Sequence, residues 1–114
     1  FTADGREYAI YLGPDEHTPA PWVNVIANPK FGALVSETGA GFTWFGNSQR
    51  NRLTPWSNDP LSDPHGEALY IRDEATGEAW SPVPGPMPGA TDYQMRHGFG
   101  WDGQRTARGM SRLQ

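Results

Sequence analysis

The chain has 114 residues, enough for one domain at most, and its formal net charge at pH 7 is −4. This acidic balance, with no basic stripe, argues against a nucleic-acid partner. The absence of cysteine excludes disulfides, thiolate metal sites and cysteine nucleophiles. No run of apolar residues approaches the roughly 20 needed to cross a bilayer, so we expect no direct membrane insertion.

The first predicted element is a strand at residues 6–12. Alternation places three of its side chains on one face, namely Tyr8, Ile10 and Leu12, which is typical of a half-buried strand. The Gly-Pro-Asp sequence at 13–15 ends it, because proline cannot donate to a ladder and glycine tolerates a positive φ. An extended connector with two prolines follows.

A β-hairpin is predicted over residues 31–45. Its first strand follows another strand at 22–26, from which Asn28-Pro29 separates it. The glycines within residues 37–41 are typical of a tight hairpin loop, after which residues 42–45 return as the second strand.

The second half of the chain is also predicted to lack helices. Residues 46–66 show no period, and their prolines exclude a long helix or a central strand. Residues 68–73 and 78–81 predict a second hairpin, and residues 93–97 a further strand. The whole chain is therefore expected to be all-β, as an antiparallel sandwich.

The stretch between residues 44 and 60 concentrates side chains that suit a ligand. Aromatic rings stack on the C–H faces of sugars, while amides and guanidinium groups pair with hydroxyls. This composition points to carbohydrate. The candidate carbohydrate-binding residues are Trp44, Arg50, Asn51, Arg52, Trp56, Asn58 and Asp59.

A structural role for the same stretch is the alternative. Trp44 and Trp56 would then pin the loop to the sheets, while the asparagines and Asp59 close turns before Pro60. An arginine of this stretch would pair with a local carboxylate instead of a ligand.

No metal site and no catalytic residue is predicted. An oxygen-rich group could hold Ca²⁺, but its spacing fits no EF-hand; it consists of Asp59, Asp63, His65 and Glu67. His97 could be written into a triad with Ser81 or Asp92, yet the chain has no G-x-S-x-G elbow to present a nucleophile.

Four long motifs resemble one known family. They are TPAPWVNVIANP at residues 18–29, FGALVSETG at 31–39, NSQRNRLTPWSNDP at 47–60 and ALYIRDEATGEAWSP at 68–82. Together they are similar to the N-terminal part of the phosphorylase-type region of cyclic β-1,2-glucan synthases. That region belongs to glycoside hydrolase family 94, formerly glycosyltransferase family 36, with the cellobiose and chitobiose phosphorylases.

The resemblance implies that this chain is an incomplete fragment of a large, supersandwich-like β-sandwich domain. In the family an (α/α)6 barrel follows and carries the general acid and the phosphate-binding residues, and nothing in this sequence matches it. The implied chemistry is reversible glucosyl transfer between a β-glucoside and inorganic phosphate, which is a co-substrate; no cofactor is implied. The resemblance also implies a cytoplasmic location, on the cytoplasmic side of the inner membrane if the parent is a synthase.

The expected function is that of a non-catalytic N-terminal part of a β-glucan synthase or phosphorylase, inactive alone. It would contact a β-glucan or β-glucoside and pack against the missing barrel. The alternatives are a free-standing carbohydrate-binding module and a purely structural sandwich. The resemblance covers residues 1–101, our predicted domain; residues 102–114 depart from the family, and we expect them to form a poorly ordered tail.

Overall fold

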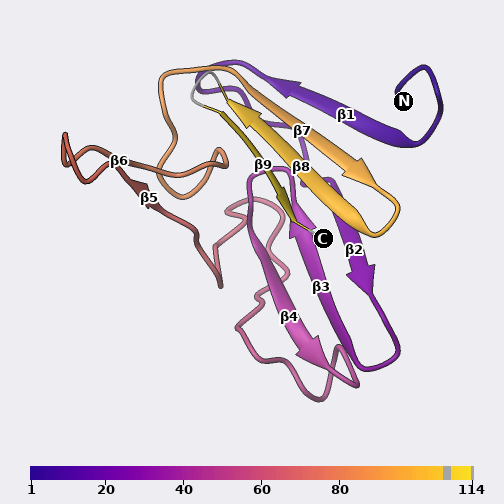
Figure 1. Ribbon diagram of the computed structural model, residues 1–114. Helices are drawn as coiled ribbons and strands as arrows, with labels where there is room; N and C mark the ends of the chain where they lie inside the picture. Colours follow the sequence, from indigo (N-terminus) through magenta and orange to yellow (C-terminus); the bar gives the residue numbers. More distant parts are fainter. Residues whose placement is uncertain (107–108, 114) are drawn as a thin grey trace.

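The computed structural model describes residues 1–106 and 109–113, and every regular element within them is a strand (Figure 1). All strand pairs are antiparallel, which confirms the predicted all-β class. The described part of the chain has no helix that could span a membrane. The strands are β1 (Glu7–Leu12), β2 (Val23–Ala27), β3 (Phe31–Ser36), β4 (Gly41–Phe45), β5 (Ile71–Arg72), β6 (Ala79–Trp80), β7 (Tyr93–Gly98), β8 (Trp101–Thr106) and β9 (Gly109–Leu113).

The hydrophobic core lies on one face of a four-stranded sheet of order β1-β7-β8-β9, the core sheet. Ile10 and Leu12 of β1 lie opposite Met95 and Tyr93 of β7, and the four side chains are buried together. Because successive side chains point to opposite faces, Tyr11 is 71% exposed. The predicted inner face of the first strand is thus confirmed.

A second sheet of order β2-β3-β4, the hairpin sheet, packs on the core sheet and extends beyond it (Figure 1). Phe31 pairs with Phe45 and Leu34 with Phe42, so the predicted hairpin at residues 31–45 is confirmed. Val35 of β3 packs against the buried core cluster. The end of the hairpin sheet that contains Val35 therefore covers the buried core cluster.

The turn between β3 and β4 is buried, which is unusual for a hairpin end. Ser36 and Ala40 are fully buried, and Glu37 is only 1% exposed. The Glu37 carboxylate accepts a hydrogen bond from the Thr18 hydroxyl and another from the Trp22 amide at 2.6 Å. A buried carboxylate is tolerated only with such partners. The proline-containing connector before β2 is therefore held by a single side chain of the turn.

Strand β8 is held by polar contacts, not by apolar alternation. The buried Asp102 accepts a hydrogen bond from the Asn24 amide at 2.9 Å, and its carboxylate lies 2.8 Å from His97 Nδ1. Residues 102–106 lie in β8 and residues 109–113 in β9. The poorly ordered tail expected from residue 102 onward stays a prediction. Strand β8 pairs with β7 along its whole length, but its sequence shows no apolar alternation from which a strand could be predicted. The domain limit at residue 101 stays a prediction.

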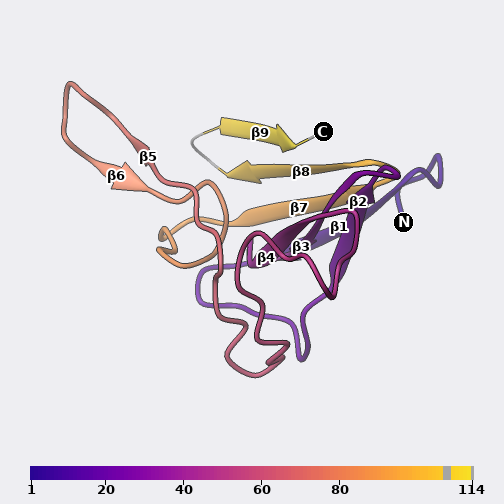
Figure 2. The ribbon, with the colours of Figure 1, turned by 90° about the horizontal axis from the view of Figure 1, so that it is seen from below.

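The predicted second hairpin exists but is much shorter than expected. Only two residue pairs join β5 to β6, and the hairpin stands apart from both larger sheets (Figure 2). Its turn has the expected chemistry, since Asp73 accepts the Ala75 amide at 2.7 Å and Gly77 takes a φ of 74°. The strands stop early because no sheet covers them, and an isolated hairpin is marginal in water.

We predict that Glu37→Gln lowers the free energy of unfolding by about 1–3 kcal/mol, because the charge-assisted hydrogen bonds to the buried carboxylate become weaker bonds to a neutral amide. Urea denaturation measures the change. Glu74→Gln, at an exposed turn, is the matched control and should leave the midpoint unchanged. Equal midpoints for the two variants would contradict a structural role for Glu37.

Candidate functional site

The loop at residues 46–66, which follows β4, carries six of the seven predicted carbohydrate-binding residues. It opens with a turn in which the Asn47 side chain accepts the amides of Gln49 at 3.0 Å and Arg50 at 2.8 Å. The Asn51 side chain then donates to a β4 carbonyl at 3.0 Å. The asparagines therefore shape the loop, as the structural alternative requires.

Three of the predicted residues gather around one buried ring. The Phe42 ring lies 5.3 Å from that of Trp44 and 5.2 Å from that of Trp56, and the Arg52 guanidinium carbon lies 5.1 Å from the Phe42 ring centre. Arg52 also donates to the Ser48 carbonyl at 2.9 Å. Both tryptophans are half-buried. Their packing pins the loop to the hairpin sheet and leaves part of each ring accessible.

Asn58 and Asp59 build a separate exposed turn. Asn58 adopts a φ of 51°, and the Asp59 carboxylate accepts the Ser62 hydroxyl at 2.6 Å and the Leu61 amide at 3.0 Å. These bonds, the Ser62 hydroxyl first, lower the pKa of Asp59 below its usual value.

Arg50 differs from the other predicted residues. Its side chain is exposed and forms neither a hydrogen bond nor an ion pair with the described part of the chain. The structure thus brings Trp44, Arg52 and Trp56 together and leaves Arg50 available. A carbohydrate contact by any of the seven residues stays a prediction.

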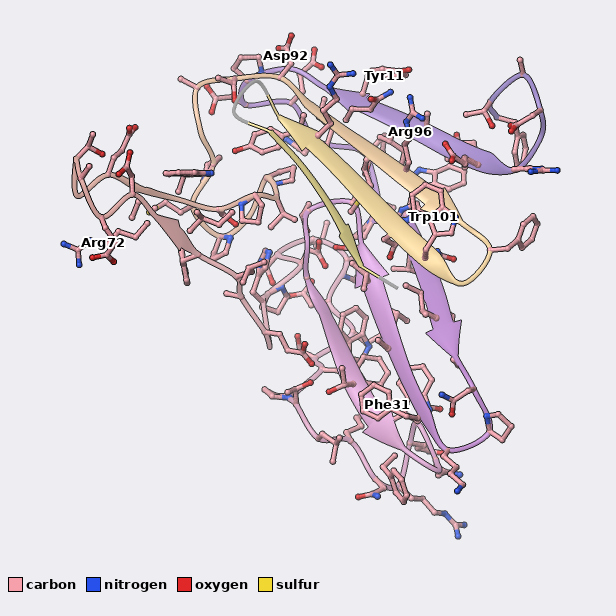
Figure 3. All side chains as sticks on the ribbon, in the orientation of Figure 1. Tyr11, Phe31, Arg72, Asp92, Arg96 and Trp101 are labelled. Atoms are coloured by element: carbon pink, nitrogen blue, oxygen red, sulfur yellow. The ribbon has the colours of Figure 1, made fainter. Side chains whose placement is uncertain are left out.

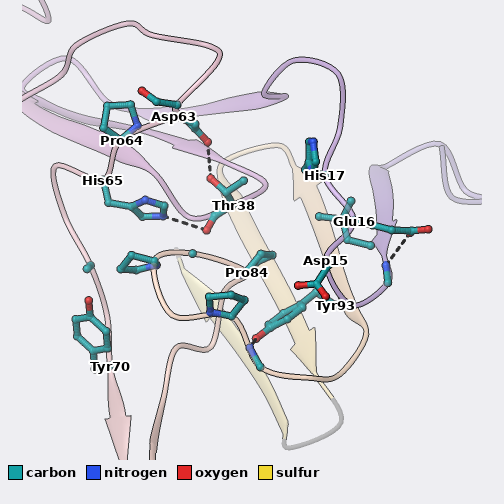
Figure 4. A pocket seen from close by; sticks show the side chains of 18 residues that line it. Asp15, Glu16, His17, Thr38, Asp63, Pro64, His65, Tyr70, Pro84 and Tyr93 are labelled. Atoms are coloured by element: carbon teal, nitrogen blue, oxygen red, sulfur yellow. Dashed lines mark hydrogen bonds between the residues drawn. The ribbon is translucent and has the colours of Figure 1, made fainter.

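A cavity of about 680 Å³ borders the end of this loop (Figure 4). Its walls come from segments far apart in the sequence, mainly residues 12–17, 62–65 and 84–89, together with Tyr70 and Tyr93. The described lining therefore combines carboxylates, imidazoles, phenols and several proline rings.

The buried hairpin turn supports one wall of this cavity. Asp63 accepts hydrogen bonds from the Ser36 hydroxyl at 3.1 Å and from the Thr38 hydroxyl. The Thr38 carbonyl accepts the Gly85 amide at 2.8 Å and lies 3.2 Å from His65 Nε2. Both lining segments, one on each side of β5 and β6 in the sequence, are thus fixed to the same turn.

Sequence reasoning missed this cavity. The segments at 13–15 and 83–89 carried only turn and proline signals, and no local pattern indicates that they meet. The sequence indicated Asp63 and Glu67 as possible Ca²⁺ ligands. In the structure Asp63 bonds Ser36 and Thr38, whereas Glu67 accepts a hydrogen bond from Thr54. Within residues 1–106 and 109–113 no three metal-binding side chains come together.

The side chains considered for a triad with His97 do not bond to it in the structure. His97 faces Asp102, while the Ser81 hydroxyl donates to the carbonyls of Leu69 at 3.1 Å and Gly85 at 3.0 Å. Ser81 is therefore a buried structural hydroxyl.

The sheets are antiparallel, and the hairpin sheet packs on the core sheet as in a β-sandwich. A family model described as "Glycosyl hydrolase 94, supersandwich domain" matches residues 6–103. This chain belongs to that family, as the sequence motifs indicated.

Relatives of known function share the same stretch. The chain is 44% identical over 102 residues to the cyclic beta-(1,2)-glucan synthase NdvB of Rhizobium meliloti (strain 1021). This alignment spans 89% of our chain and 4% of the synthase. It is 34% identical over 104 residues to N,N'-diacetylchitobiose phosphorylase of Vibrio proteolyticus, and 33% over 104 residues to solabiose phosphorylase of Paenibacillus borealis. Both alignments span 89% of this chain and 13% of the relative. The chain thus spans a small part of each relative.

We predict that Asp63→Ala costs about 1–3 kcal/mol more stability than Asp15→Ala, since the Ser36 and Thr38 hydroxyls lose their acceptor. Asp15 is a matched control. Both aspartates have a positive φ, 39° and 60°, and the Asp15 side chain forms no hydrogen bond with the described residues. Denaturant titration of the two variants gives the difference, and equal losses would show that backbone strain alone matters.

Proposed function

We propose that this chain is the non-catalytic N-terminal supersandwich part of a larger β-glucan synthase or disaccharide phosphorylase. It supplies inter-domain packing and contacts to a β-glucan or β-glucoside, and it is inactive alone. The observation that carries the proposal is the 44% identity to a glucan synthase over a stretch that makes up only 4% of that protein. The catalytic barrel and a location on the cytoplasmic side of the inner membrane belong to the same proposal.

Exposed apolar side chains support the packing role. Val23 and Val25 project from β2, an edge strand of the hairpin sheet, and Val25 is 54% exposed. Phe31 and Phe45 lie opposite each other at the far end of the same sheet and are also exposed. Val25 is in register with Leu34, three residues from Phe31, so the valines and the phenylalanines lie on opposite faces of the sheet. Exposed apolar side chains on both faces and an open edge strand are typical of an element that another part of a protein covers.

The loop at residues 46–66 supports the carbohydrate role. Trp56 of the loop and Trp44 of β4 are half-buried and present ring surface, and Arg50, between them in the sequence, offers an exposed fork of donors. A purely structural sandwich would need the tryptophans but not Arg50. Arg50 therefore separates the two roles better than Trp44 or Trp56, whose loss would also disturb the Phe42 cluster.

We expect Arg50→Ala to weaken binding of a β-glucan oligosaccharide about fivefold, the loss of roughly 1 kcal/mol of hydrogen bonding, with no change in stability. Isothermal titration calorimetry measures the affinity. The matched control is Arg72→Ala, because Arg72 lies at the outlying β5–β6 hairpin (Figure 3) and is equally exposed.

Equal binding by both arginine variants would contradict the carbohydrate contact and favour the purely structural sandwich. Trp56→Ala gives a second reading. A loss of stability with unchanged glucan affinity would assign the tryptophan to loop packing alone, as its 5.2 Å contact with Phe42 allows.

A further inference from the structure

We propose that the 680 Å³ cavity binds one or two neutral sugar units and rejects phosphate. The inference rests on the proposed carbohydrate role and adds a second sugar site to the candidate surface on the loop at residues 46–66. The volume lies within the roughly 300–1,000 Å³ of typical small-molecule pockets. Figure 4 shows His65 and Tyr70 on one side of the cavity and Asp15 and Tyr93 on the other.

The cavity is preformed. Four prolines in its lining have a fixed φ and present apolar ring edges; they are Pro64, Pro84, Pro86 and Pro88. The His65 ring lies so close over Gly85 that a Cβ at that position would be 2.4 Å from the imidazole. Walls that are already ordered lower the entropic cost of binding.

The charge of the lining selects against anions. Asp15, Glu16 and Asp63 contribute carboxylates, and the described lining contains neither lysine nor arginine. A phosphate would meet repulsion from these groups without a cation to offset it. A neutral sugar avoids this repulsion.

The polar groups that remain available match hydroxyls. Tyr93 accepts the Gly89 amide at 2.7 Å, so its own proton is free to be donated. Both hydrogen bonds to Asp63 use Oδ2, so Asp63 Oδ1 forms none with the described residues. The Tyr70 hydroxyl forms none with them either. Every hydroxyl of a sugar both donates and accepts, whereas the hydrogen phosphate dianion has a single O–H donor and its other oxygens only accept. Tyr70, 54% exposed, adds an aromatic face for sugar C–H groups.

The test is an NMR titration of the ¹⁵N-labelled 114-residue chain with cellobiose and, separately, with inorganic phosphate. It is run at about pH 8, where an ordinary imidazole is uncharged. We expect cellobiose to give saturable shifts of the Gly85 and Gly89 amides, and phosphate to give none. Tyr70→Ala should weaken cellobiose binding about fivefold. Tyr11→Ala, at another exposed tyrosine outside the cavity, should not.

Three results would overturn the inference. Shifts confined to residues 47–59 would move the sugar to the loop and leave the proposed function intact. Saturable shifts of the Gly85 and Gly89 amides by phosphate would contradict the charge argument. No saturable response to cellobiose anywhere would overturn both the cavity site and the carbohydrate part of the proposed function.

Discussion

The buried turn between β3 and β4 is the constraint on which the rest of this domain depends. Hairpin turns usually face solvent, where water satisfies their polar groups. Here Ser36 and Glu37 are inside the molecule, so protein groups must replace that water. Glu37 takes its partners from the connector before β2, whereas Ser36 and Thr38 take Asp63 from the long loop. Gly39 completes the turn with a φ of 89°, and a Cβ there would come 2.5 Å from Val83. One turn thus fixes three irregular segments.

Those irregular segments carry both candidate sugar surfaces. The loop at residues 46–66 stays in place because Trp44 and Trp56 enclose Phe42, which leaves Arg50 at the surface. The cavity exists because the same turn holds Asp63, His65 and Gly85. The proposed role, sugar contacts without catalysis, would be favoured by rigid loops of this kind, since ordering flexible loops upon binding costs affinity.

Local patterns predicted most of the strands but not the cavity. Alternation at Tyr8, Ile10 and Leu12 predicted β1 and its buried face, and the glycines after Glu37 predicted the hairpin turn. Strand β8 was not predicted, because its buried Asp102 finds its partners outside the strand. These are Asn24, 78 residues away, and His97, 5 residues away. The cavity was not predicted for a related reason. Proline and glycine indicate where a chain bends, but they do not indicate which bends lie together in the fold.

The most direct test of this account is amide hydrogen exchange in Thr38→Val, a change that removes the hydroxyl donated to Asp63 and keeps the carbonyl that accepts the Gly85 amide. If the turn organises the cavity, exchange should accelerate at the amides of Asp63 and Gly85, while the amide of Met95 in the central strand β7 keeps its protection. Unchanged exchange at Asp63 and Gly85, or equal acceleration throughout the chain, would contradict the central role of the turn.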